Sequence, residues 1–108
     1  MHGSRESVII NKMIESFRDK ATEDLYHGKA TARARQFAAD MIPVALRKLD
    51  MLNAAKDFQD LLSPPGNRLE ALKGKLRGFY SIRVNEQWRI VFRWHQRSAH
   101  DVQLTDYH

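Results

Sequence analysis

The chain has 108 residues, of which 43% are hydrophobic, and its formal net charge is +5. This length favours one domain with a single core, and no apolar run is long enough to span a bilayer. Cysteine is absent, which excludes disulfides and cysteine-ligated metal and fits the cytoplasm, where we expect the protein to reside. The positive charge favours a polyanionic partner, either nucleic acid or an acidic protein, although a soluble protein can also be basic without such a partner.

The first residues differ in character from the rest of the chain. Met1 to Ser7 reads Met-His-Gly-Ser-Arg-Glu-Ser, which is typical of a cloning remnant or of an upstream start. Met13 is an alternative first residue. The predicted organisation is therefore an N-terminal extension over residues 1–12 and one domain over residues 13–108, although Val8 to Ile10 could extend the first strand.

The N-terminal half is predicted to contain one strand and two helices. Residues 13–18 alternate between apolar and polar side chains, which indicates a short strand. His27, Gly28 and Lys29 form a turn, and Ala32 to Ala39 is rich in the helix formers Ala, Arg and Gln. A second helix, or a kinked continuation, runs from Asp40 or Met41 to Ala55, with Pro43 in its first turn.

The apolar residues of this second helix follow helical spacing and predict the face that packs on the core. They are Val44, Leu46, Leu49, Leu52 and Ala55. Arg47, Lys48 and Asp50 are expected on the solvent side.

The C-terminal half is predicted to be mostly strand. Residues 57–62 form a short helical turn, and the Ser-Pro-Pro-Gly-Asn segment at 63–67 forms a loop. A short strand covers 69–73. Three further alternating segments follow around 80–84, 88–94 and 102–105, which indicates consecutive antiparallel strands with one buried face. The helices would cover that face, which gives a small α+β domain.

The strand register predicts a group of cations on the other face of the sheet. If Val84 lies opposite Trp88, all even-numbered apolar residues share one face, and Arg83 then lies opposite Arg89. Like charges directly across a ladder are unfavourable, unless solvent surrounds them or an anion binds between them. The neighbouring basic residues favour phosphate binding. The candidate RNA- or phosphate-binding residues are Lys75, Arg77, Arg83 and Arg93.

The last strand adds groups that can transfer protons. If Phe92 lies opposite Val102, then Arg89 lies opposite Thr105, and the terminal residues 106–108 emerge beside Arg89. Metal-independent RNA cleavage requires a group that removes the ribose 2′-OH proton, a group that protonates the departing 5′ oxygen, and cations that stabilise the transition state. No HExxH, Walker A or EF-hand pattern is present, so no metal or other cofactor is expected.

Three motifs together resemble the HigB toxins, the plasmid-maintenance killer proteins of the RelE-like superfamily. They are Leu72-Lys73-Gly74, Asn85-Glu86-Gln87-Trp88-Arg89-Ile90 and the terminal Asp106-Tyr107-His108. The resemblance covers Met13 to His108 and is weakest in the helices. It implies a RelE-like fold, with two to three helices packed on one face of a small, mostly antiparallel sheet of four to five strands.

The resemblance also implies a function. HigB toxins belong to type II toxin–antitoxin systems and are ribosome-dependent mRNA endonucleases, which cleave codons in the A site by 2′-OH attack and so inhibit translation. The implied partners are the ribosome, mRNA and a HigA-type helix-turn-helix antitoxin. The toxin would contact DNA only indirectly, through the antitoxin. Two alternatives are a non-catalytic basic binding module and a degenerate toxin that only binds its antitoxin.

The resemblance assigns candidate catalytic residues. Lys73 and Arg89 match the phosphate-stabilising positions, and Asp106, Tyr107 and His108 match the terminal catalytic positions. Glu70 stands where the HigB pattern has a histidine, and the related toxin YoeB carries a glutamate in a comparable role. Glu70 is thus the candidate general base and His108 the candidate general acid. Strict alternation places Glu70 and Lys73 on opposite faces, so a bulge or loop must intervene if both serve the site.

Overall fold

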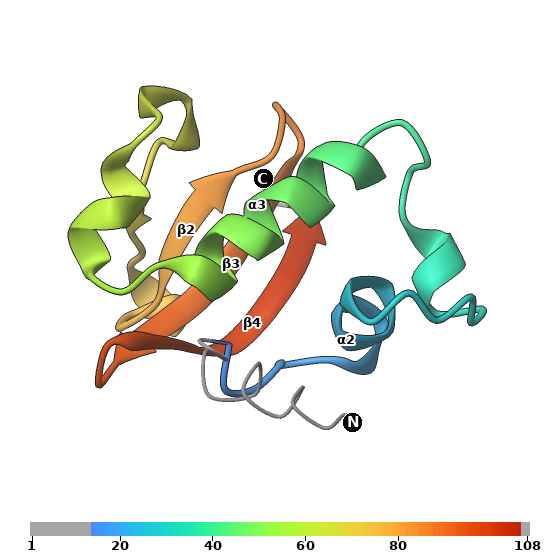
Figure 1. Ribbon diagram of the computed structural model, residues 1–108, viewed down its shortest axis with the longest axis horizontal. Helices are drawn as coiled ribbons and strands as arrows, with labels where there is room; N and C mark the ends of the chain where they lie inside the picture. Colours follow the sequence, from blue (N-terminus) through green and yellow to red (C-terminus); the bar gives the residue numbers. More distant parts are fainter. Residues whose placement is uncertain (1–13, 107–108) are drawn as a thin grey trace, which may run out of the picture.

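The computed structural model describes residues 14–106, so predictions for residues 1–13, Tyr107 and His108 lie outside the described residues. Figure 1 shows α3 lying across one face of the sheet and α2 beside its β4 side. The sheet is antiparallel with strand order β1-β2-β3-β4. The helices are α2 (Lys20–Tyr26) and α3 (Ile42–Ala54), and the strands are β1 (Glu70–Ala71), β2 (Tyr80–Arg83), β3 (Trp88–His95) and β4 (Ser98–Asp106). Short 3₁₀ turns cover Ala34–Gln36, Phe58–Leu62, Pro65–Asn67 and Gly74–Leu76.

The α+β prediction is confirmed: two α-helices pack against a four-stranded antiparallel sheet. The core lies between α3 and the even-numbered face of the sheet. Its fully buried side chains include Leu49, Leu52, Ile82, Ile90 and Phe92. No helix within residues 14–106 is long and apolar enough to cross a membrane.

The predicted second helix is confirmed as α3, with Pro43 in its first turn. One part of its predicted pattern is wrong, because Lys48 is buried with 7% of its surface exposed. Its ammonium group donates a hydrogen bond to the side-chain oxygen of the fully buried Asn67. A lysine can be buried when its charge is hydrogen-bonded, and this partner is too distant in sequence for helical spacing to reveal it.

The prediction of a helix over 32–39 is wrong, since only Ala34–Gln36 forms a 3₁₀ turn. Local propensity is overridden by side-chain contacts. The hydroxyl of Thr31 donates to Asp24 and accepts from the Ala34 amide, and Phe37 leaves the turn in extended conformation to pack edge-on against Trp88.

The sequence reading also missed α2. Its signal is the N-cap Asp19, whose carboxylate accepts a hydrogen bond from the Thr22 amide at 3.2 Å. The predicted strand over 13–18 is reduced to isolated parallel bridges from Ile14 and Phe17 to β4. This extended segment lies along the edge of β4 and carries the chain into α2.

The predicted register of the main strands is confirmed. Arg83 lies opposite Arg89, and Arg89 lies opposite Thr105. The ladder between β3 and β4 shifts by one residue beyond Val91, where Asp101 adopts a left-handed conformation with φ 52°, as in a β-bulge. The strand predicted over 69–73 is shorter than expected, since β1 contains only Glu70 and Ala71.

Candidate functional site

The candidate site lies on the face of the sheet opposite α3. Odd-numbered residues of β2 and β3 point to this face, which places Ser81, Arg83 and Arg89 together. Glu70 pairs with Ser81 across β1 and β2 and brings a carboxylate to the same face. The antiparallel register therefore gathers a carboxylate and two arginines from three strands.

Arg89 is the most tightly held charged side chain of this group, with only 12% of its side chain exposed. Its Nε donates to the Ser81 hydroxyl at 2.8 Å, and one terminal nitrogen donates to the Arg68 carbonyl oxygen at 2.8 Å. The same nitrogen lies 3.7 Å from a carboxylate oxygen of Glu70. These contacts fix the plane of the guanidinium group, as a site for a tetrahedral phosphate requires.

The backbone conformation of Arg68 makes one of these contacts available. Arg68 follows the 3₁₀ turn Pro65–Asn67 and has φ 46°, in the left-handed region. This residue therefore turns the chain sharply before β1. The turn leads directly into Glu70, so one short segment supplies both the carbonyl and the carboxylate that contact Arg89.

An open depression of about 390 Å³ lies beside Arg89. Arg83 occupies its other side, where Nε donates to the Asn85 carbonyl at 3.1 Å and a terminal nitrogen lies 3.9 Å from the Glu86 carboxylate. Three guanidinium groups thus face two carboxylates in an accessible hollow. Such an excess of positive charge suits a phosphodiester. The lining residues are Arg68, Glu70, Arg83, Asn85, Glu86 and Arg89.

The C-terminal strand reaches the same end of the sheet. Thr105 lies opposite Arg89, and Asp106 lies opposite Trp88. The Asp106 carboxylate accepts a hydrogen bond from the Gln87 side chain at 2.9 Å, in the turn that joins β2 to β3. By alternation Asp106 points to the face opposite to that of Arg89. The predicted terminal residues Tyr107 and His108 lie outside the described residues.

The remaining predicted cations lie further along the sheet. Lys73 is the exposed residue before the 3₁₀ turn Gly74–Leu76, and Lys75 and Arg77 are exposed in and after that turn. The loop that the sequence required between Glu70 and Lys73 is present, because β1 ends at Ala71. Arg93 is exposed near the far end of β3. None of these four side chains lines the depression.

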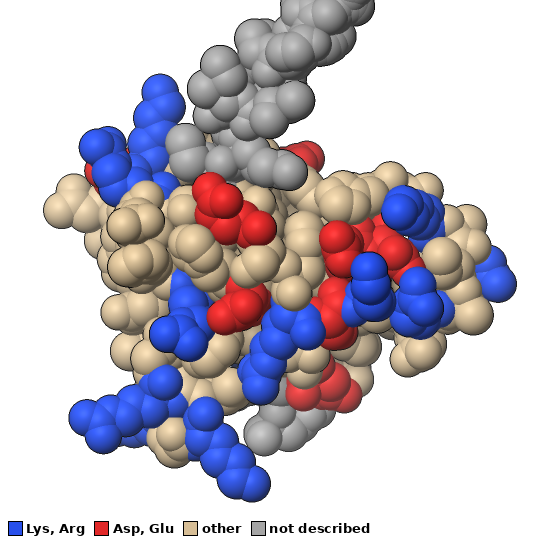
Figure 2. Space-filling view, turned by 90° about the horizontal axis from the view of Figure 1, so that it is seen from below, with Lys and Arg blue, Asp and Glu red and all other residues tan. Residues whose placement is uncertain are grey.

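Sequence reasoning missed Arg68, Ser81, Asn85 and Glu86 as neighbours of the site. Asn85 and Glu86 stand inside the Asn-Glu-Gln-Trp-Arg-Ile motif and could have been found from it. The carbonyl of Arg68 depends on a left-handed residue that no sequence pattern indicated. Figure 2, which views the molecule from below, shows separate groups of Lys and Arg side chains with Asp and Glu between them. The charge on this side of the molecule is therefore mixed.

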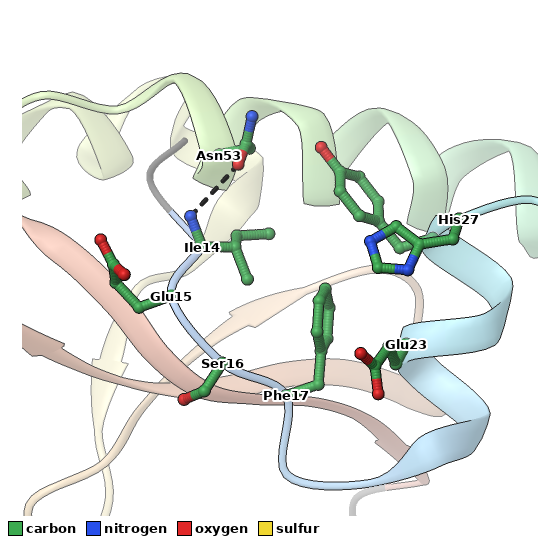
Figure 3. A pocket seen from close by; sticks show the side chains of 8 residues that line it. Ile14, Glu15, Ser16, Phe17, Glu23, His27 and Asn53 are labelled. Atoms are coloured by element: carbon green, nitrogen blue, oxygen red, sulfur yellow. Dashed lines mark hydrogen bonds between the residues drawn. The ribbon is translucent and has the colours of Figure 1, made fainter. Parts of the chain in front are cut away.

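A second pocket of about 320 Å³ lies between residues 14–17, α2 and α3 (Figure 3). Phe17, Tyr26 and His27 form an aromatic cluster with ring centres 5.8 to 5.9 Å apart. Burial, together with a hydrogen bond to Asp50, raises the pKa of Tyr26 to about 12. Because Glu15 and Glu23 also line the pocket, it is unfavourable for RNA. We therefore keep the depression around Arg89 as the candidate site.

Comparisons with known proteins identify the family of the chain. Residues 15–108 match the family model described as the RelE-like toxin of the type II toxin–antitoxin system HigB. The chain belongs to the HigB-like toxin family. It is 43% identical over 82 residues to Toxin HigB-1 of Vibrio cholerae serotype O1, covering 76% of this chain and 84% of that protein. It is 28% identical to the Endoribonuclease HigB of Proteus vulgaris, over 89% of this chain and the full length of that protein.

The HigB-like chain also matches solved structures in fold. The YoeB–YefM complex of Staphylococcus aureus matches with a TM-score of 0.55 and 24% identity, over 88% of this chain and 94% of that chain. This likeness supports the RelE-like fold. Within residues 14–106 of this HigB-like toxin, no three His, Asp or Glu side chains are grouped so as to hold a metal ion.

Proposed function

We propose that this HigB-like toxin is a ribosome-dependent mRNA endonuclease that cleaves codons in the A site and so inhibits translation. The observation that carries the proposal is the immobilised Arg89 guanidinium beside Glu70 in an open depression. The family membership and the name of the Proteus vulgaris relative, Endoribonuclease HigB, support the same reaction.

In the proposed mechanism the scissile phosphate binds between Arg83 and Arg89. Glu70 removes the 2′-OH proton, and the 2′ oxygen attacks phosphorus. The bond to the 5′ oxygen breaks, and His108 protonates that leaving oxygen. The products are a 2′,3′-cyclic phosphate and a 5′-hydroxyl. Arginines stabilise the added charge on the phosphoryl oxygens, which is the role of preorganised donors in other sites.

The other predicted residues have supporting roles. Lys73 adds positive charge at the turn after β1, Asp106 and Tyr107 orient the terminal residue, and Lys75, Arg77 and Arg93 attract the RNA backbone. In the proposed reaction the protein's own side chains supply the general base, the general acid and the positive charge, so the toxin itself requires no metal ion.

The proposed partners are the ribosome with its mRNA and a HigA-type helix-turn-helix antitoxin. The antitoxin would inhibit the toxin and connect it to operator DNA. Since the ribosome is the site of action, the proposed location is the cytoplasm. Co-expression with the product of the adjacent gene, followed by co-purification, tests the antitoxin assignment.

Expression in growing bacteria tests the reaction. The wild-type chain should arrest growth and create new mRNA 5′ ends detectable by primer extension, whereas Arg89→Ala and His108→Ala should do neither. Arg47→Ala is the matched control, because Arg47 is exposed on α3 in the other layer. Growth arrest without new 5′ ends would indicate a binding protein that does not cut. Full toxicity in both site variants would contradict the assigned residues.

A further inference from the structure

The face of the sheet that carries Arg89 continues beyond the depression to an aromatic side chain flanked by two arginines. Phe79 directly precedes β2, and the β2–β3 register places it opposite Arg93. The guanidinium carbon of Arg93 lies 5.6 Å from the centre of the Phe79 ring, and that of Arg18 lies 5.2 Å from it. These three residues are called the Phe79 cluster below.

The cluster is assembled from three separate parts of the chain. Arg18 comes from the extended segment that lies along β4, where its amide donates to the Val102 carbonyl. Arg93 comes from β3. Phe79 follows Gly78, whose φ of 95° lies in the left-handed region and suits glycine. The Phe79 carbonyl accepts a hydrogen bond from the Leu72 amide. The strand ladder therefore fixes the position of the ring.

The two arginines remain accessible although they contact the ring. Both are exposed, and Phe79 is half-buried. Exposed cation–π contacts are weak, so either guanidinium group can move at small cost. A hollow of about 300 Å³ adjoins the cluster and is lined partly by Gly78 and Arg93. Asp101 also borders this hollow, but its carboxylate accepts a hydrogen bond from the Ser16 hydroxyl.

The cluster is aligned with the candidate catalytic residues. Phe79, Ser81 and Arg83 are alternate residues pointing to one face, and Ser81 holds Arg89. Phe79 and Arg83 are four positions apart along the strand, a distance of about 13 Å. A short stretch of single-stranded RNA can therefore contact both places at once. Positive grooves with aromatic side chains that stack on bases are how proteins hold single strands.

We propose that the Phe79 cluster is a second RNA-binding site, in which a base of single-stranded RNA stacks on Phe79 while Arg18 and Arg93 contact the adjoining phosphates. This inference rests on the proposed function in naming RNA as the ligand and in giving Arg93 a phosphate contact. The RNA is either mRNA next to the cleaved codon or a ribosomal RNA strand. Both present the same bases and phosphates, and the experiment distinguishes them.

Two substitutions at Phe79 separate stacking from folding. Phe79→Leu keeps an apolar side chain over the sheet but removes the aromatic ring, whereas Phe79→Tyr retains the ring. In fluorescence anisotropy with a labelled single-stranded RNA, Phe79→Leu should weaken binding roughly 5- to 100-fold. Phe79→Tyr should stay within about twofold of wild type, because stacking requires only the aromatic face. Thermal melting of each variant monitors the fold.

Salt dependence tests the two arginines. Each phosphate contact contributes about 0.7 to the slope of log affinity against log salt for single strands. Arg18→Gln and Arg93→Gln should each reduce this slope by about that amount. Arg47→Gln is the matched control and should leave the slope unchanged, since α3 covers the opposite face of the sheet.

Binding to ribosomes identifies the source of the RNA. If Phe79→Leu weakens binding to empty ribosomes, the strand is ribosomal RNA; a loss only with free RNA or mRNA-loaded ribosomes indicates mRNA. The inference is overturned if Phe79→Leu binds every RNA as wild type does, if Phe79→Tyr loses as much as Phe79→Leu, or if only antitoxin binding weakens. Phe79-dependent RNA binding without mRNA cleavage would leave this inference standing and refute the proposed function alone.

Discussion

Replacement of Asn67 by alanine should destabilise the whole domain, because this side chain connects α3 to the loop that precedes the site. Asn67 is completely buried. Its side-chain oxygen accepts a hydrogen bond from the Lys48 ammonium group, and its nitrogen donates to the Leu61 carbonyl at 3.1 Å. Asn67→Ala leaves a buried ammonium group and a buried carbonyl without this partner.

The magnitude follows from those two contacts. A hydrogen bond to a charged group contributes about 1.5–3 kcal/mol and a neutral one about 1 kcal/mol, so Asn67→Ala should lower the free energy of unfolding by about 3 kcal/mol. In a domain of this size that corresponds to a fall in Tm of roughly 12–24 °C. Urea titration followed by circular dichroism measures the free energy, and a thermal scan measures Tm.

Lys48→Met provides the control for this reasoning, since it removes the charge that Asn67 satisfies. In the Lys48→Met background, Asn67→Ala should cost only about 1 kcal/mol, the value of the neutral contact. A cost below about 1 kcal/mol for Asn67→Ala in the wild-type background would refute the argument. An unchanged cost in the Lys48→Met background would also refute it, because the two side chains would then be energetically independent.

Three further predictions address the site, the acid stability and the terminus. Arg89→Lys keeps the charge but cannot reproduce both 2.8 Å hydrogen bonds, so the initial rate of mRNA cleavage in a translation reaction should fall about 10²-fold or more; a rate equal to wild type would show that guanidinium geometry is unimportant. The Thr31 hydrogen bond, followed by the hydrogen bond and charge of Arg33, lowers the pKa of Asp24. The stabilising contribution of the Asp24 carboxylate is therefore complete above the unfolded pKa of about 3.9 and is lost as pH falls through the lower folded value. Asp24→Asn should be less stable than wild type at neutral pH, and the two proteins should become equally stable in acid. Urea titrations at several pH values measure this difference. A C-terminal tag should impair growth arrest far more than an N-terminal tag if His108 is the general acid, and equal toxicity of the two tagged forms would argue against that role.

Alternation along the strands was sufficient to predict much of the candidate site. Keeping the even-numbered apolar residues on one face placed Arg83 opposite Arg89. With Phe92 assumed opposite Val102, Arg89 was placed opposite Thr105, and the structure has both pairs. This prediction succeeded because a one-residue slip would move every buried side chain into solvent. Register is thus encoded by the hydrophobic pattern itself.

Contacts between distant or irregular segments could not be predicted in this way. The carbonyl of Arg68 reaches Arg89 only because that residue adopts a left-handed conformation. Helical spacing predicts that Lys48 faces solvent, and only the structure shows that it is buried against its hydrogen-bond partner Asn67. The cluster around Phe79 requires Arg18, which lies far away in sequence. In contrast, α2 had a local signal in the N-cap Asp19, which the sequence reading overlooked.

Mapping of mRNA 5′ ends in a reconstituted translation reaction is the most direct test of the central claim. The account predicts new ends within codons when wild-type toxin and translating ribosomes are both present, no new ends with Arg89→Gln, and wild-type ends with Arg47→Gln. Identical ends and yields from Arg89→Gln and wild type would contradict the claim that the depression beside Arg89 is the catalytic site.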